Sequence, residues 1–252
     1  MSSSRAATRD EQRSRLVAAA IDALEHGGPE AVQARELGAR VGASAQAVYT
    51  LFGGMPGVFE ALVIEGLARL AEHVAAVPET DDPVADHFSK GWAYHDWAIA
   101  HPQLYRAMFG LTGPDLRLRA RLEITTRGMA DFPEGRAAWQ VMLDSVERII
   151  ASGRIPPVDP LLAARQFFSA THGHVLLHIA GAFGNPDDAL LVLGALALNL
   201  MIGLGDARDA AQNSLLATLA TRTDPFHTAG PDRTVHSAAE PAQIATDQRN
   251  VR

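Results

Sequence analysis

The chain has 252 residues and no cysteine, which excludes both a disulfide framework and a metal site built from thiolates. Hydrophobic residues make up 47% of the chain but aromatic residues only 6%, and alanine and leucine dominate, so the composition predicts an all-α protein. The net charge of −7 lies in residues 59–221, whereas residues 1–58 are neutral and residues 1–15 are rich in arginine. A basic N-terminal segment on an acidic body suits a protein that approaches DNA from one end.

Helical periodicity and helix-ending residues divide the chain into a series of helices. A helix over residues 9–26 ends at Gly27-Gly28-Pro29, a short helix over 34–41 ends at Gly42, and Ser44 can cap a second short helix over 45–51. Further helices are predicted over residues 55–77, 83–100, 103–110, 134–152, 159–182, 186–204 and 206–220. Residues 111–133 are expected to form a partly helical connector.

Three segments indicate where the protein is located in the cell and which part of the chain is disordered. Residues 1–10 are polar and no apolar segment follows them, which argues against a secretory signal peptide. The most apolar stretch, residues 189–204, is short for a membrane span and contains Asn199, so we interpret it as a buried helix. We therefore expect a cytoplasmic protein with no membrane partner. Residues 222–252 have few large apolar side chains, and we expect them to be a disordered tail.

Residues 34–52 read ARELGARVGASAQAVYTLF and have the pattern of a helix-turn-helix, with the turn at Gly42. Four apolar side chains face a small core, namely Leu37, Val41, Val48 and Phe52. Gln46 lies on the opposite face, where it can pair with adenine, and hydroxyl groups there can reach phosphate oxygens. Any short helix pair in a bundle can contain a glycine turn, so the spacing alone leaves DNA binding and plain packing both open.

The same residues resemble the DNA-binding domain of the TetR family. The resemblance lies in RSRLVAAAIDALEHGG, RELGARVGAS and VYTLF within residues 10–60, and FSATHGHVLLHIAG resembles the Trp-His-Gly motif of one branch's C-terminal domain. It implies an all-α fold in which an N-terminal three-helix helix-turn-helix domain precedes a larger helical regulatory and dimerisation domain. The implied boundaries are 1–54 for DNA binding, 55–221 for ligand binding and dimerisation, and 222–252 for the tail.

The chain departs from the family pattern at several positions that contact phosphate in relatives. Gln33 stands where a capping Ser or Thr is usual, Leu51 replaces a common His, and Met55 stands where a Lys is common. Residues 168–171 also lack the Trp of the C-terminal motif. Fewer charged contacts imply weaker non-specific binding or a larger role for the arginine-rich N-terminal segment.

The resemblance implies a regulator, expected to be a repressor, that binds a palindromic double-stranded DNA operator and releases it on binding a small, largely apolar effector. The residues expected to contact DNA are Arg5, Arg9, Arg35, Ser44, Ala45, Gln46, Tyr49 and Thr50. The candidate effector-lining residues are Phe88, Trp92, Trp97, Tyr105, Met108, Phe109, Trp139, Met142, Phe168 and His172. For any one of these, plain core packing is the alternative interpretation.

Helices 159–182 and 186–204 are apolar over most of their circumference. One face of each can pack on its own core while the other needs a partner, so we expect a homodimer through a four-helix bundle. Leu193 and Leu198 are candidate positions on the partner face. The alternative is that both helices are simply central.

Two rival functions stay open. The sequence has no enzyme motif such as GxSxG or a P-loop, so we expect no enzymatic activity and no cofactor. His174 and His178 share a helix face, but without HExxH or cysteine ligands we interpret them as packed or surface histidines and expect no metal. The second rival is a helical ligand-binding module that has lost DNA binding or binds DNA weakly.

Overall fold

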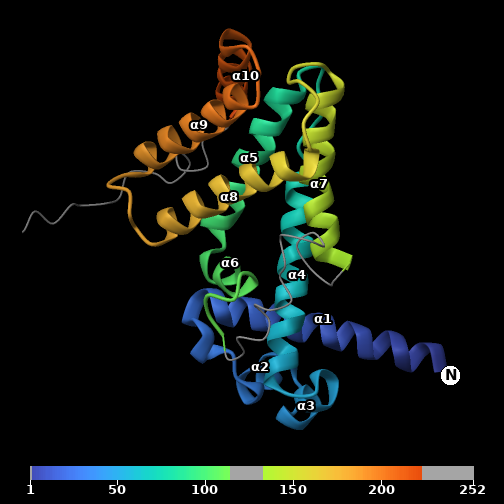
Figure 1. Ribbon diagram of the computed structural model, residues 1–252. Coiled ribbons are helices and arrows are strands. Elements are labelled where there is room, and N and C mark those ends of the chain that lie inside the picture. The colour runs from blue at the N-terminus through green and yellow to red at the C-terminus, as the bar shows by residue number, and fades with distance from the viewer. Residues whose placement is uncertain (1, 114–132, 223–252) are drawn as a thin grey trace, which may run out of the picture. The chain divides into compact units, whose positions relative to one another are not determined.

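A computed structural model of the chain describes residues 2–113 and 133–222, with side chains from Thr8 onward, and within these ranges it is built from helices (Figure 1). The α-helices are α1 (Ser2–Gly27), α2 (Ala34–Val41), α3 (Ala45–Phe52), α4 (Met55–Ala75), α5 (Pro83–Ala100), α6 (Pro102–Met108), α7 (Pro133–Ala151), α8 (Pro160–Ile179), α9 (Pro186–Gly203) and α10 (Arg208–Thr221). The predicted all-α fold is confirmed. The connector predicted over residues 111–133 and the predicted tail lie mostly outside the described residues.

The largest boundary difference is at α1, which begins at Ser2 and not at residue 9. Residues 2–8, SSSRAAT, contain no proline or glycine, so no helix-breaking residue prevents the helix from extending toward the N-terminus. At the other helices the observed bounds lie within three residues of the predicted ones, because glycine, proline and capping side chains mark most ends.

The turn between α2 and α3 depends on two glycines. Gly42 ends α2 with a φ of 72°, a left-handed conformation that glycine adopts without steric cost. Gly38 lies under the turn, and a Cβ atom at this position would come within 2.6 Å of the Ala43 carbonyl oxygen. Leu37 and Val48 are both fully buried and hold the two helices against α1. Together these residues fix the angle at which α3 leaves the body.

Helix α4 follows α3 directly and extends from the end of the protein that carries α2 and α3 to the remaining helices. Figure 1 shows α2 and α3 at one end of α4 and α7 alongside its other end, and α4 packs against α1, α5, α6 and α7. At its start, a Cβ atom on Gly57 would lie 1.8 Å from the Phe52 carbonyl oxygen, so only glycine fits this approach. The backbones of α3 and α4 are therefore in direct contact.

A network of ionic and hydrogen-bonding groups joins α5, α10 and the segment after α7. The Arg154 guanidinium donates to Asp206 at 3.0 and 2.7 Å and to Asp82 at 3.0 Å. Ser214 donates to the other Asp82 oxygen at 2.6 Å, and Asp82 also caps the first turn of α5. Because the Asp206 side chain is 2% exposed, its charge depends on Arg154 for compensation.

Residues through Arg222 form one compact unit, so the described helices belong to a single body. Arg222, expected at the start of the tail, instead packs on this body. Its guanidinium lies 4.8 Å from the Trp92 ring centroid and donates to Asp96 at 2.7 Å, and both contacts retain it at the end of α10.

Helix α9 carries an uncovered apolar face formed by Leu191, Val192 and Leu196, which are 72%, 41% and 37% exposed. Leu193, one of the two candidate positions for the partner face, is 3% exposed and packs inside the protomer. Among the described residues, α9 is the one helix that by itself has the length and hydropathy of a membrane span, and 22% of it is buried. Helices α3 and α4 reach that length and hydropathy only when they are counted together as one bent span. One such helix is weak evidence for a membrane.

Candidate DNA-binding and effector-binding sites

Helix α3 presents most of its side chains to the surface. Val48 is its one buried residue, whereas Gln46, Tyr49 and Thr50 are exposed and Ala45 is half-buried. Ser44 is also exposed and caps the helix, because its Oγ accepts from the Ala47 N–H at 3.1 Å. This face has the small and polar side chains that a recognition helix needs in the major groove.

The hydroxyl groups on this face differ in what they can offer DNA. A hydroxyl has one proton to donate, and phosphate oxygens only accept. Ser44 uses its oxygen as an acceptor in the cap, so its proton stays available. Thr50 donates to the Gln46 carbonyl at 2.8 Å, so a phosphate contact would first require that bond to break. Ser44 is therefore the better phosphate donor of the two.

The arginines near α3 divide into two groups. Arg9 and Arg35 are exposed, as a phosphate contact requires, and Arg5 lies in α1 ahead of the described side chains. Arg13 lies over the Phe52 ring at 5.2 Å, and Arg40 forms an ion pair with Asp22. Arg9 and Arg35 therefore stay available to solvent, whereas Arg13 and Arg40 contact other residues of the first three helices.

Gln33 precedes α2, at the position where relatives commonly carry a capping hydroxyl. Its side chain makes no cap to the α2 backbone and instead donates to the Glu30 carbonyl at 2.9 Å. The exposed first turn of α2 therefore keeps N–H groups that a phosphate can use, but without help from Gln33.

A cavity lies between α4, α5, α7 and α8, with an empty volume of about 640 Å³ that includes its opening to solvent. Three of its lining residues were expected from the sequence, namely Trp139, Met142 and Phe168. Leu70 and Val74, near the C-terminal end of α4, form another wall. These apolar walls suit a largely apolar or aromatic molecule.

A few polar groups interrupt the apolar lining. His87 is buried, its Nδ1 bonds to Ser145 Oγ at 2.9 Å, and its ring centroid lies 4.4 Å from that of Phe167. Burial, reinforced by the charge of Lys90, lowers the pKa of His87 to about 4, so the ring is neutral at pH 7. Lys90 also lines the cavity and donates to Glu79 at 2.9 Å. The cavity thus offers a neutral imidazole and one ammonium group to a ligand.

The other predicted lining residues lie elsewhere in the body. Phe88 and Trp92 line a second cavity of about 320 Å³, which shares His87, Gly91, Phe167 and Thr171 with the first. Five predicted residues line neither of these two cavities and are packed in the core or against it, namely Trp97, Tyr105, Met108, Phe109 and His172.

Sequence reasoning missed the polar side of the main cavity. His87, Lys90 and Tyr94 line it from one face of α5, together with Gly91. Their spacing of three, four and seven residues is the helical repeat, so the recurrence of polar side chains on one face of α5 was the available signal. Aromatic content alone did not separate the cavity walls from the core.

Hydrogen bonds between buried side chains connect the cavity wall to α6. Tyr94 lines the cavity and its hydroxyl bonds to the Tyr105 hydroxyl at 2.7 Å, which in turn bonds to His172 Nδ1 at 2.6 Å. Burial raises the pKa of both tyrosines above the usual value, so the hydroxyls keep their protons. Tyr105 belongs to α6, whose first N–H groups are held by Glu25 of α1 at 2.9 and 3.3 Å.

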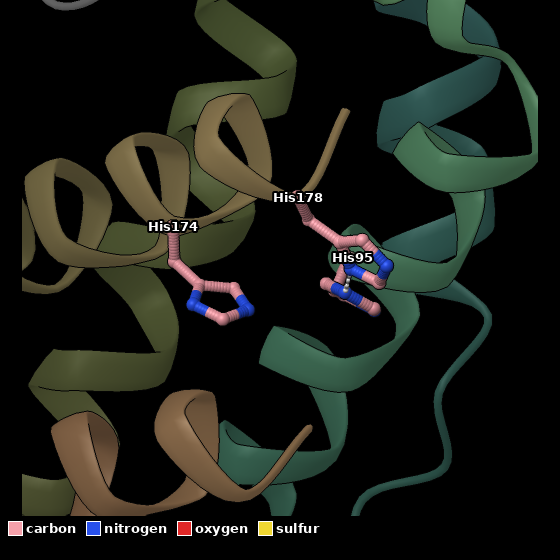
Figure 2. Close-up of side chains that lie close together, drawn as sticks. All are labelled: His95, His174 and His178. Carbon is pink, nitrogen blue, oxygen red and sulfur yellow. Dashed lines mark hydrogen bonds between the residues drawn. The ribbon is translucent and has the colours of Figure 1, made fainter. Parts of the chain in front are cut away.

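A separate histidine cluster lies outside both cavities. The sequence paired His174 with His178 on one face of α8, and the structure adds His95 from α5 (Figure 2). One ring nitrogen from each of the three lies within 4.8 Å of those of the other two. This is the one group of three or more possible metal ligands among the described residues.

Comparison with known proteins gives two sequence matches. Residues 16–62 match the family described as bacterial regulatory proteins, tetR family. Residues 89–199 match the tetracyclin repressor-like C-terminal domain. No curated protein matches the sequence of the chain.

Several solved structures share the fold. A protein of unknown function from Rhodococcus sp. RHA1 is 25% identical, with a TM-score of 0.63 over 77% of this chain and 96% of that one. RolR in complex with its ligand resorcinol is 12% identical, with a TM-score of 0.58 over 83% and 95%. PfmR, a TetR family transcriptional regulator from Thermus thermophilus, is 16% identical, with a TM-score of 0.51 over 77% and 100%.

The two sequence matches cover the helix-turn-helix and most of the helical body, and the solved structures extend the likeness to nearly their whole length. Members of this family are DNA-binding regulators and not enzymes. The chain therefore belongs to the TetR family of transcriptional regulators.

Proposed function

We propose that the protein is a cytoplasmic repressor that binds a palindromic operator as a homodimer and releases it when a small, largely apolar molecule enters the cavity. One observation carries this proposal. Two residues separate α3 from α4, and the backbone of α4 lies against α3 at Gly57. Near the other end of α4, Leu70, Ala71 and Val74 line the cavity. A ligand in the cavity therefore touches the helix that positions α3.

A second route connects the cavity to the helices that carry α3, through Tyr94, α6 and α1. A ligand that displaces Tyr94 also disturbs its bond to Tyr105, and Tyr105 lies in α6, whose N-terminus is held by Glu25 of α1. A shift of α4 or α6 would change the distance between the two α3 helices of a dimer, which must match successive major grooves. The effector must bind the DNA-incompetent state more tightly, because equal affinity for both states shifts nothing.

The proposed dimer forms through α8 and α9. Leu191, Val192 and Leu196 are exposed on α9, and Leu177 on α8 is 53% exposed. A two-fold axis through this face would bury the same leucines of both subunits and present two α3 helices to one side of the DNA. The symmetry of the dimer is the reason to expect a palindromic operator.

The lining favours an effector with an aromatic or aliphatic body and one or two polar groups. Trp139, Phe167 and Phe168 supply apolar walls, and His87 and Lys90 supply hydrogen-bonding groups. A neutral imidazole can donate to or accept from a hydroxyl, and an ammonium group can only donate. A phenol or an aromatic acid satisfies these groups better than a cation does.

Capture of fragmented genomic DNA by the full-length protein tests the proposal. We expect enrichment of an inverted repeat, and we expect Gln46→Glu to abolish it, because this nearly isosteric change brings a carboxylate against DNA from an exposed position. The unfolding transition of Gln46→Glu should match that of the wild type. Equal enrichment by both proteins would show that α3 does not read the operator.

A helical ligand-binding module without useful DNA affinity is the second candidate. It is favoured by Gln33, whose side chain bonds to Glu30 and not to the start of α2, and by the absence of a Lys at Met55. If the capture experiment enriches no sequence while the protein still binds small aromatic compounds, this second function is the correct one.

A further inference from the structure

The three histidines His95, His174 and His178 converge from two helices, and none of them lines either cavity (Figure 2). His174 and His178 are four residues apart on α8, a spacing that directs both rings to one side of a helix. His95 reaches them from α5, and its Nε2 lies 3.0 Å from Nδ1 of His178. The three ligand atoms all lie within 4.8 Å of one another.

His174 is buried without a polar partner. His174 is 3% exposed, and neither of its ring nitrogens has a hydrogen-bond partner among the described residues. The ring of Phe183 lies 4.8 Å away and covers one side of it. Buried polar groups are nearly always paired, so an imidazole with two unpartnered nitrogens facing two other imidazoles points to a missing ligand.

His95 has the supporting contact that metal-binding histidines usually have. Its Nδ1 bonds to Asp96 Oδ1 at 2.9 Å, and Arg222 donates to the same carboxylate oxygen at 2.7 Å. A proton on Nδ1 that is donated to a carboxylate leaves Nε2 unprotonated and directed toward His178. A carboxylate in this place orients a ligating histidine and increases its basicity.

We propose that His95, His174 and His178 bind one divalent first-row transition metal ion, with Zn²⁺ as the first candidate. Three imidazoles without a carboxylate suit Zn²⁺, Ni²⁺, Co²⁺ or Cu²⁺ and are poor ligands for Mg²⁺ or Ca²⁺. Zn–N bonds of ~2.0–2.1 Å at a tetrahedral angle separate the nitrogens by about 3.3 Å, so small side-chain rotations bring the three atoms into range. A fourth position stays open to water or to a small ligand. The ion would tie α5 to the C-terminal part of α8.

Metal titration of the untagged full-length protein, after treatment with a chelator, tests this site. Competition with a chromophoric chelator should show one tight Zn²⁺ equivalent per chain. The visible spectrum with Co²⁺ should show the intense bands of a four-coordinate ion. His174→Gln and His178→Gln should each weaken Zn²⁺ binding by at least 100-fold, since each removes one of three ligands. Circular dichroism and the metal-free melting curve should show that both variants fold.

Two further variants sharpen the result. His73→Gln changes an exposed histidine on α4 far along the chain from the cluster and should leave Zn²⁺ affinity unchanged. Asp96→Asn should weaken Zn²⁺ by about 10–100-fold while the Co²⁺ spectrum keeps its four-coordinate bands, because Asp96 orients a ligand without being one. X-ray absorption of the wild-type Zn²⁺ complex counts its imidazole ligands and does not depend on any variant folding.

The proposal is overturned if the wild type binds Zn²⁺ no more tightly than His174→Gln. It is also overturned if X-ray absorption of the bound ion finds fewer than three imidazoles. Neither result would affect the proposed repressor function, because the cluster is separate from α3 and from both cavities.

Discussion

Helices α3 and α8 use their side chains in opposite ways. In α3 only Val48 is buried, and Gln46, Tyr49 and Thr50 are exposed to solvent. In α8 six residues are buried, and two of them, Phe167 and Phe168, also form the wall of the cavity. The comparison teaches that the exposed face of α3 can change with little effect on folding, whereas residues that line the cavity also hold the protein together.

The largest expected effect is on the stability of the body, at Arg154. Replacing Arg154 by Ala leaves Asp206 buried without its partner and should lower the free energy of unfolding by about 3–5 kcal/mol. Arg69→Ala is the matched control, because Arg69 and Glu65 form an exposed pair worth at most about 1 kcal/mol. Urea denaturation of both variants measures the difference. Equal losses would mean that the network around Arg154 is not a stabilising element.

The next largest effect is a pH dependence of the unfolding free energy that arises from His87 in the cavity wall. Because the pKa of His87 is about 4 in the folded protein against about 6.5 unfolded, the unfolded chain binds more protons between these values. Stability should therefore fall as the pH drops from 6.5 to 4, with His87 contributing up to about 3 kcal/mol. His87→Gln removes this titration and should reduce the slope of the unfolding free energy between pH 6.5 and pH 4, to which His172 and His174 also contribute. An unchanged slope would contradict the buried, neutral imidazole.

The third effect separates the outer face of α9 from the core. Leu191→Glu should weaken the proposed dimer by about 2–3 kcal/mol for each leucine that loses its burial. The fold itself should be unaffected, because this side chain is 72% exposed in the protomer. Sedimentation equilibrium should show the 26.9 kDa chain as a dimer in the wild type and in the control Leu111→Glu, and as a monomer in Leu191→Glu. A variant that stays dimeric would assign the interface to another surface.

The smallest effects are expected on α3, where stability should not change at all. Gln46→Ala should cost about 1–3 kcal/mol of discrimination at one base position in each half-site. Tyr49→Phe removes a hydroxyl from a side chain that is 46% exposed and should weaken binding to all sequences by about 1 kcal/mol. Binding measured on operator variants distinguishes the two patterns. A loss of stability in either variant would mean that α3 is more deeply packed than its exposure indicates.

The contrast between α3 and α8 also explains what the sequence could predict. The observed bounds of α2 and α5 agree with the predicted ones, because Gly42 and Pro83 act within one turn of the helix they delimit. The outward face of α3 follows from periodicity over a few residues, and Gln46, Tyr49 and Thr50 are indeed exposed. Local signals suffice where the surface comes from one continuous segment.

The cavity and the histidine cluster come from segments far apart in the chain. Leu70, His87, Trp139 and Phe168 meet only because α4, α5, α7 and α8 pack together, and no local pattern specifies that meeting. Trp97 is as aromatic as Trp139, yet it lies against His101 at 4.9 Å and lines neither cavity. Likewise, the metal ligands proposed above include His95, which the spacing of His174 and His178 does not indicate.

The central claim is that occupancy of the cavity controls α3, and reciprocal binding tests it most directly. Compounds that quench the fluorescence of Trp139 in the wild type, but give a smaller change in Trp139→Phe, identify ligands of the cavity. For such a compound, operator affinity is measured with and without ligand, and ligand affinity with and without operator. Both should fall by the same factor, about 5- to 150-fold for a coupling of ~1–3 kcal/mol. A compound that binds tightly in the cavity and leaves operator affinity unchanged would contradict the account.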